Sequence, residues 1–432
     1  MDSDGLWEIF KVIIASSTGT FLEWYAFFIA GIAAAQVWPH VFYGKFTPAV
    51  AFALSLVSYG IIFFTRPIGS WIFGWLGDRK GRKEILTWTL IITGTATLGI
   101  ALIPSYSSIG ILAPTLLNLF RAIQGIGLGG EFGGATSWVL ENVSASKWRA
   151  LWTSWVQWTV PFGTLLATYS YLLVHIFYKG TEFLIWGWRI PFIVAFAVAI
   201  IGIVIRYYMP ESPLFNILTT RKMVEKAPFS TMLKKEWKKV ILLSFLFSYI
   251  SIIYSGMVSP VSLNLLGVLH VPPETALSYI SYGLIFALFT LPLGGFLGDV
   301  IGRRFVAILS TVLTVISASV FFTLIKTVEP LYITLGEVTL IGFAYIFLGV
   351  VPAFYTESFS IFYRYSGSGF SFQLGNLIAG VIVGIVIPIF IASSHGILAA
   401  TNKITVVAVL FTIISLISAV LLKDTKNVDV SL

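Results

Sequence analysis

Long apolar segments alternate with short polar ones along almost the whole chain of 432 residues. A helix of about 20 residues crosses the hydrocarbon core of a bilayer, and each of these segments is about that long or longer. We expect twelve membrane-spanning helices, near residues 11–38, 48–76, 85–103, 111–140, 150–177, 187–208, 240–269, 276–297, 305–325, 331–356, 365–392 and 403–422. No small-residue cleavage site follows the first segment, so we expect a retained helix rather than a signal peptide.

The composition agrees with lipid as the main solvent of this chain. Hydrophobic residues make up 57% and charged residues 11%, whereas a soluble domain carries about 25% charged residues. The absence of cysteine excludes disulfides and thiolate metal sites. The four histidines are scattered over different helix ends without ligand spacing. We therefore expect no metal and no other cofactor.

The net charge of +8 reflects loop charge rather than a nucleic-acid surface, because there is no folded polar domain to carry a basic face. Most lysines and arginines fall in the loops on one side of the predicted helices. Such a bias marks the cytoplasmic side. We expect a multi-pass protein of the plasma membrane with both termini in the cytoplasm. Arg66 and Arg121 remain inside the predicted membrane segments.

A ten-residue motif occurs twice, as Gly74–Lys83 and Gly295–Arg304, with six identical positions. A looser repeat places Glu141 before Arg149 and Glu357 before Arg364. Internal repeats of membrane helices are typical of secondary transporters. We expect an all-α membrane protein with two related six-helix bundles, residues 1–210 and 240–432, joined by a lysine-rich cytoplasmic linker, 211–239. The linker either follows the anionic leaflet or is a solvated tether.

These motifs resemble a known family. The repeated Gly-x-Leu-Gly-Asp-x-x-Gly-Arg hairpin is similar to the signature between helices 2 and 3 of the major facilitator superfamily. Further segments resemble its metabolite:proton symporter family: Phe21–Tyr25, Arg66–Gly69, Arg121–Gly125 with Gly129–Glu131, Gly187–Phe192, Arg364–Gly367 and Gln373–Gly375. The resemblance implies import of a small organic acid, zwitterion or related metabolite with protons. It also implies an acidic residue after Glu-Trp-Tyr, where this chain has Ala26.

Charged residues inside the membrane are candidates for function because burying them is expensive. Arg121 and Arg66 are candidates for binding an anionic group, with Gln124 beside Arg121 on the predicted helix 111–140. Glu23 and Glu131 are candidates for carrying the proton, since the family's usual carboxyl is absent at Ala26. For each of these charged residues a structural ion pair or a helix–helix hydrogen bond is the alternative.

Uncharged polar residues line the same predicted region. Hydroxyl groups fall on one face of the segment 240–269, and amides occur on two other segments; the candidates are Gln157, Ser248, Ser251, Tyr254, Ser255, Gln373 and Asn376. They predict either a substrate-binding surface or tight helix packing through small residues.

The motif residues Asp78, Arg79, Arg82, Asp299 and Arg303 are the candidates for gating. A carboxylate in such a loop can meet the positive N-terminal end of a neighbouring helix. In the superfamily this contact stabilises the outward-facing state, so the resemblance implies a conformational lock.

Together these observations predict a monomeric secondary transporter that imports a small organic metabolite, an anionic carboxylate, by alternating access with protons. Its expected partners are that substrate, protons and membrane lipid, with no nucleic acid. The alternatives are a passive facilitator or an exporter. An intramembrane enzyme is disfavoured because neither clustered metal ligands nor a nucleophile with a base is evident.

Overall fold

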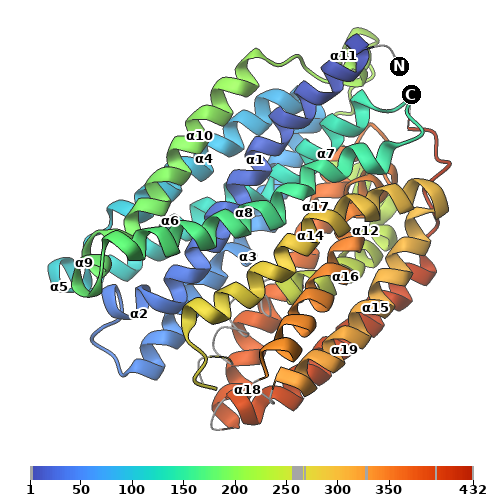
Figure 1. Ribbon diagram of the computed structural model, residues 1–432. Helices are drawn as coiled ribbons and strands as arrows, with labels where there is room; N and C mark the ends of the chain where they lie inside the picture. The colour runs from blue at the N-terminus through green and yellow to red at the C-terminus, as the bar shows by residue number, and fades with distance from the viewer. Residues whose placement is uncertain (1–2, 255–265, 267–268, 326–328, 395–396, 431–432) are drawn as a thin grey trace.

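The computed structural model describes residues 3–254, 266, 269–325, 329–394 and 397–430. Within these ranges the chain is helical and contains no strand. Figure 1 shows two groups of long helices lying side by side, one from the first half of the chain and one from the second. The start of α1 (Ser3–Gln36) and the stretch after the last helix lie at the same end of the molecule.

The first group is built from seven long or half-length helices and four short ones. The long ones are α1, α3 (Pro48–Lys80), α4 (Arg82–Leu102), α6 (Leu112–Gly129), α7 (Glu131–Asn142), α8 (Arg149–Phe177) and α10 (Ile190–Tyr208). The short ones are α2 (Trp38–Val41), α5 (Tyr106–Ile109), α9 (Gly180–Ile185) and the single turn η1 (Gly187–Arg189).

The second group follows α11 (Pro213–Thr220). Its elements are α12 (Pro228–Ile252), α14 (Pro273–Ile301), α15 (Arg303–Leu324), α16 (Pro330–Glu357), α17 (Arg364–Val381), η4 (Ile382–Val386), α18 (Ile387–Ser393) and α19 (Ile397–Leu421). Many of these helices begin with proline, whose missing N–H costs nothing in the first turn.

Ten described helices are long and apolar enough to cross a membrane. The other two predicted segments correspond to α6 with α7, and to α12 with residues beyond Tyr254 that lie outside the described ranges. The predicted linker 211–239 is partly helical, since it contains α11 and the first turns of α12. Those turns carry four lysines and extend α12 well beyond its apolar part.

The helix predicted over 111–140 is interrupted at the single residue Gly130, between α6 and α7. Glycine dominates this region, and glycine weakens a helix. Glycine is needed at these two positions because neighbouring helices pack closely against them. A Cβ at Gly129 would lie 2.1 Å from the Arg66 carbonyl oxygen, and a Cβ at Gly130 would lie 2.5 Å from the Phe73 Cβ. The break separates Arg121 on α6 from Glu131 on α7.

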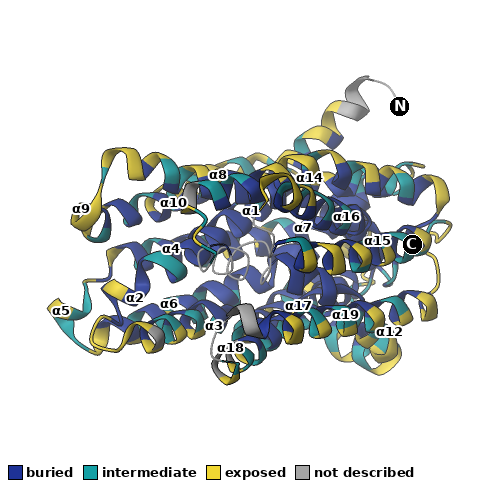
Figure 2. Cartoon of the chain, turned by 60° about the horizontal axis from the view of Figure 1, so that its bottom comes forward, coloured by how far each residue is buried: buried dark blue, intermediate teal, exposed yellow. Residues whose placement is uncertain are grey.

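Large apolar side chains cover the outside of the molecule, while arginines are buried within it. Trp88, Phe289 and Ile316 are more than half exposed, and Figure 2 shows exposed positions concentrated on the outer faces of the helices. The fully buried large side chains include Arg66, Arg82, Arg121, Arg206 and Arg303. This pattern suits lipid outside and polar contacts between helices inside.

Candidate functional site

The first cluster of buried charge joins α1 to α3. Glu23 Oε1 lies 3.2 Å from Arg66 NH1, and both side chains are buried. The Arg66 guanidinium also lies over the rings of Trp24 and Phe27, at 5.8 and 5.3 Å from their centroids. None of its three nitrogens, nor Glu23 Oε1, has a hydrogen-bond partner among the described residues. Arg66 therefore retains buried donors that an added anion could satisfy.

Arg121 lies in a separate and better satisfied environment. It donates to Gln124 Oε1 at 2.5 Å and to the Tyr59 carbonyl oxygen at 2.8 Å. Gln124 in turn donates to Thr97 Oγ1 at 2.8 Å. Arg121 makes no ion pair with any described residue. Its guanidinium faces the Trp38 and Tyr59 rings, so the side chain is a cation without a nearby carboxylate.

Glu131 is paired with Arg206 rather than placed beside Arg121. Thr89 Oγ1 donates to the same carboxylate at 2.9 Å, and Arg206 also donates to the Ala15 carbonyl oxygen at 3.2 Å. This cluster ties together α1, α4, α7 and α10. The sequence analysis did not single out Arg206, which lies in the last turn of α10 and is fully buried.

A second polar cluster joins α12 to α17. Ser251 Oγ donates to Asn376 Oδ1 at 2.8 Å, and the Tyr254 hydroxyl donates to the same oxygen. Asn376 Nδ2 donates to Gln373 Oε1 at 3.1 Å. Among the described residues, Ser248 Oγ donates only to the Phe245 carbonyl oxygen of its own helix. Ser255 lies outside the described residues.

The two clusters meet across the boundary between the helix groups. The Trp24 and Tyr254 rings contact edge to face, with centroids 4.9 Å apart. Gln373 Nε2 donates to the Leu128 carbonyl oxygen of the first group at 3.4 Å. Gln157 on α8 is buried, and neither polar atom of its amide has a partner in the described part of the chain. The structure thus brings Glu23 and Arg66 next to the Tyr254–Asn376 group. Glu131 is paired with Arg206 and approaches α1 at Gly19, about one turn before Glu23.

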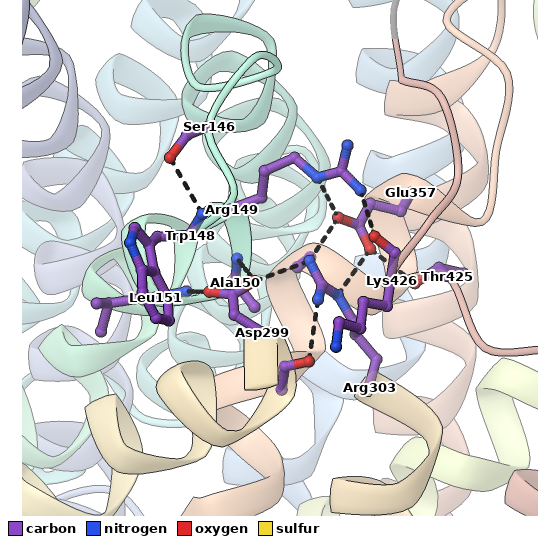
Figure 3. A network of polar contacts seen from close by, with 12 residues as sticks. Ser146, Trp148, Arg149, Ala150, Leu151, Asp299, Arg303, Glu357, Thr425 and Lys426 are labelled. Atoms are coloured by element: carbon purple, nitrogen blue, oxygen red, sulfur yellow. Dashed lines mark hydrogen bonds and ion pairs between the residues drawn. The ribbon is translucent and has the colours of Figure 1, made fainter. Parts of the chain in front are cut away.

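At the end of the molecule that carries both motif loops, each motif aspartate caps a helix of the other group. Asp78 accepts hydrogen bonds from the backbone N–H groups of Tyr365 and Ser366 at 3.1 and 2.9 Å. Asp299 accepts from Ala150 and Leu151 at 3.0 and 2.8 Å. Figure 3 shows the second contact. These are the first turns of α17 and α8, where unsatisfied N–H groups and the helix dipole favour a carboxylate.

The motif arginines connect these caps to buried glutamates. Arg82 donates to Glu141 Oε1 at 3.0 Å, and Arg303 donates to both oxygens of Glu357 at 3.0 Å. Each glutamate also faces an arginine of the other group: Arg149 Nε lies 2.9 Å from Glu357 Oε1, and Arg364 NH1 lies 3.6 Å from Glu141 Oε1.

Arg79 does not belong to this network. It is exposed, and its guanidinium lies 4.8 Å from the centroid of the Trp75 ring. The sequence analysis grouped it with the gating residues because it stands inside the motif. The structure places it on the outer surface of the loop.

The sequence analysis missed several residues that complete the network. Glu211 accepts from the backbone N–H of Arg82 at 3.0 Å, and Asp424 accepts from that of Arg304 at 2.8 Å. The hydroxyl of the residue after each acid donates to the buried glutamate of its own half: Ser212 to Glu141, and Thr425 to Glu357 at 2.7 Å. The sequence did contain a signal for these residues: in each half, an acidic residue followed by a hydroxyl residue occurs soon after the last helix.

Tyr365 is the other residue that was missed. Its hydroxyl donates to the carbonyl oxygen of Gly130, at the break between α6 and α7, at 2.7 Å. Its ring is buried against three glycines of the first group, since a Cβ at Gly77, Gly133 or Gly134 would lie within 3 Å of it. In the sequence, only the glycines of the two segments that contact Tyr365 indicated that another helix packs closely there.

Known proteins share this sequence and this fold. Residues 11–241 match the family described as "Sugar (and other) transporter". The inner membrane metabolite transport protein YhjE of Escherichia coli is 34% identical over 93% of this chain and 93% of its own length. The shikimate transporter of the same organism is 30% identical, covering 96% of this chain and 95% of its own.

Among solved structures, the proton:xylose symporter XylE bound to 6-bromo-6-deoxy-D-glucose superposes with a TM-score of 0.77 at 15% identity, over 98% of this chain and 97% of XylE. That match is in the fold and confirms the predicted twelve-helix, two-bundle architecture. The chain therefore belongs to the major facilitator superfamily and is a membrane transporter, not an enzyme.

Proposed function

We propose that this transporter imports a small organic carboxylate together with protons. The observation that carries the proposal is the buried Arg66, whose guanidinium has three unfilled donor nitrogens beside a single carboxylate, Glu23. A guanidinium binds a carboxylate through two parallel hydrogen bonds. The Arg66 guanidinium lies over the Trp24 ring, which contacts the Tyr254 ring, so apolar surface adjoins the charge and suits a small metabolite.

Proton coupling follows from competition between Glu23 and the substrate for Arg66. While Glu23 is ionised, it neutralises Arg66 and a second carboxylate is disfavoured. Protonation of Glu23 leaves the arginine charge unpaired in a low-dielectric site, where an anion is strongly attracted. By reciprocal linkage, a bound anion favours the protonated form of Glu23. Proton and anion then travel together, and the carboxyl missing at Ala26 is not needed.

Alternating access requires that the motif-loop end opens when the substrate leaves. We propose that this end is cytoplasmic, that both chain termini lie there, and that the protein resides in the plasma membrane. The Asp78 and Asp299 caps, with the Arg82–Glu141 and Arg303–Glu357 pairs, would hold this end closed in the outward-facing and occluded states. The two caps cross the boundary between the helix groups, and so do the Arg149–Glu357 and Arg364–Glu141 contacts, which supports that role.

The test uses purified protein in vesicles. A thermal-shift screen of small carboxylates first selects a labelled substrate, since ligands that bind the folded state raise its apparent stability. Uptake is then driven by an inward proton gradient. Glu23→Gln should abolish accumulation but retain counterflow exchange of labelled substrate, and Arg66→Gln should abolish both. Arg79→Gln is the matched control, because it removes an exposed charge outside the proposed site. Glu131→Gln and Arg121→Gln test the other candidates for carrying the proton and binding the anion.

Two results would contradict the proposal. If Arg66→Gln transports the substrate with unchanged affinity and rate, the anion site lies elsewhere. If the parent protein equilibrates the substrate but never accumulates it under a proton gradient, the chain is a passive facilitator, and Ala26 is the simplest reason.

A further inference from the structure

A cavity of about 630 Å³ opens at the motif-loop end, between the start of α12, the end of α16 and the chain that follows α19. Four lysines line it: Lys235, Lys238 and Lys239 from α12, and Lys423 from beyond α19. The cavity does not overlap the Glu23–Arg66 site, which lies deep between α1 and α3.

Three of the four lysines are available to a ligand. Lys239 Nζ already donates to the Ser358 carbonyl oxygen at 2.6 Å and pairs with Glu236 at 3.0 Å. Lys235, Lys238 and Lys423 are exposed and make no ion pair with any residue that the structure describes. Three carboxylates also line the cavity. Glu236 pairs with Lys239, Glu357 is shared by Arg149 and Arg303, and Asp424 accepts from the backbone N–H groups of Arg304 and Lys426, so the three available lysines outnumber the carboxylates that lack a cationic partner. The cavity is therefore a cationic site.

The residues that line this cavity differ from those at the matching positions of the first half. Ser212 and Thr425 make matching bonds to Glu141 and Glu357. Three residues further on, Phe215 is 4% exposed and packs against Arg82, whereas Val428 is 39% exposed and lines the cavity.

The helix at the matching position in the first half is also much less basic. Near its start α1 carries the single lysine Lys11, which is paired with Glu8. The first turns of α12 carry four lysines. The basic rim is thus a feature of α12 that α1 does not share.

The cavity is apolar on the side that runs into the membrane helices. Leu242 of α12 and Leu421 of α19 line that side, and Leu421 is largely exposed. Trp237, which also lines the cavity and is half exposed, is of the residue type that anchors at the membrane–water boundary. A ligand that fits must combine a negative head with an apolar tail.

We propose that this cavity binds an anionic phospholipid, with its headgroup phosphate held by Lys235, Lys238 and Lys423 and its acyl chain packed along Leu242 and Leu421. Juxtamembrane lysines attract anionic lipids of the cytoplasmic leaflet. The occupied cavity adjoins Glu357 and Thr425, two members of the motif-loop network.

The experiment measures lipid retention by the intact protein, using native mass spectrometry with phosphatidylglycerol as the probe and phosphatidylcholine as the neutral reference. The test variant is Lys235→Gln/Lys238→Gln/Lys423→Gln. The control variant, Lys222→Gln/Lys226→Gln/Lys234→Gln, removes the same charge from exposed lysines that do not line the cavity. At about fivefold for each lysine, the test variant should retain phosphatidylglycerol on the order of 100-fold more weakly, and the control should resemble the parent.

Three outcomes would overturn the proposal. Equal loss in both variants would mean that overall charge attracts the lipid without a site. Equal retention of phosphatidylcholine and phosphatidylglycerol by the parent would exclude an anionic headgroup. Displacement of the lipid by millimolar inorganic phosphate alone would identify a soluble phosphate as the ligand. None of these measurements involves transport, so they do not depend on the proposed substrate.

Discussion

The two copies of the motif build the same electrostatic contact but different packing. Both aspartates cap a helix of the opposite half through two backbone N–H groups. The first glycine of each motif also approaches the other half alike: a Cβ at Gly74 would lie 2.9 Å from the Ser366 Cα, and one at Gly295 would lie 2.8 Å from the Ala150 carbonyl oxygen. In the aspartate caps and in the packing of the first motif glycine, the two halves are therefore alike.

The second motif glycines differ. A Cβ at Gly77 would lie 2.1 Å from the Tyr365 ring, whereas one at Gly298 would lie 3.5 Å from the Ala150 Cβ. The first contact, between the first motif and α17, therefore includes the buried ring of Tyr365. The second contact, between the second motif and α8, has only the methyl group of Ala150 at the matching position. The two contacts thus share the same helix caps but differ in side-chain packing. Only the first contact depends strongly on how closely a side chain, the Tyr365 ring, fits against the motif glycine.

The largest expected effect comes from filling the slot that receives Tyr365. Gly77→Ala should loosen the first contact, because overpacking costs about 1–3 kcal/mol and the ring is 1% exposed and cannot swing away. Cysteine labelling measures this, since the chain has no native cysteine. Ser70→Cys reports the first contact, where Ser70 Oγ packs near Gly369, and Ser154→Cys reports the second, where Ser154 packs near Gly295.

Gly298→Ala is the matched substitution. It meets Val350 of its own half at 2.5 Å but leaves Ala150 at ordinary contact distance. It should therefore change labelling at Ser154→Cys much less than Gly77→Ala changes labelling at Ser70→Cys. Equal changes at the two reporters would remove the steric distinction between the contacts.

The next largest effect concerns the aspartate caps, which the two contacts share. Asp78→Asn and Asp299→Asn each remove a charge from a helix N-terminus, where a lost cap costs about 0.5–2 kcal/mol. Both should raise labelling at the nearby reporter, and by similar factors, because the cap distances agree within a few tenths of an ångström. A much stronger effect of Asp78→Asn would mean that Arg79 or another residue found only in the first copy contributes to the lock.

The sequence predicts the helices of this protein far better than their contacts. Composition and the positions of Gly74–Lys83 and Gly295–Arg304 were sufficient for the architecture, because apolar length and a repeat are local properties of the chain. The comparisons confirm that architecture and the superfamily. Membrane orientation and the roles of individual residues stay predictions.

Side-chain partners depend on geometry that the pattern does not contain. Glu131 was a candidate for carrying the proton, but its pairing with Arg206 on α10 joins residues 75 positions apart, which the helical pattern does not predict. Tyr365 meets glycines that lie far away in the sequence, and only the packed structure brings them together. The lysine-rich start of α12 was read as linker, since a helix that leaves the membrane loses its apolar pattern.

A smaller effect is expected from removing only the hydroxyl group of Tyr365. Tyr365→Phe keeps the ring in its slot but removes the donor to the Gly130 carbonyl oxygen, and one such hydrogen bond contributes about 0.5–1.5 kcal/mol. Labelling at Ser70→Cys should rise less than in Gly77→Ala, and labelling at Ser154→Cys should not change. A Tyr365→Phe effect as large as that of Gly77→Ala would show that the hydroxyl, rather than the fit of the ring, holds the first contact.

The smallest effect is expected at Arg79, although it occupies a motif position that the second copy fills with Val300. Its guanidinium lies over the exposed Trp75 ring, and such exposed cation–π contacts contribute about 0.5–1 kcal/mol without crossing between the halves. Arg79→Gln should leave labelling at both reporters close to that of the parent. Arg82→Gln is the matched comparison, because Arg82 is buried, bonds to Glu141 and lies 3.7 Å from Asp78. Removing it takes away the closest cation of Glu141 and the nearby cation of Asp78, and should open the first contact. If Arg79→Gln opened that contact as Arg82→Gln does, the lock would include the outer surface of the loop, and the buried network could no longer account for closure alone.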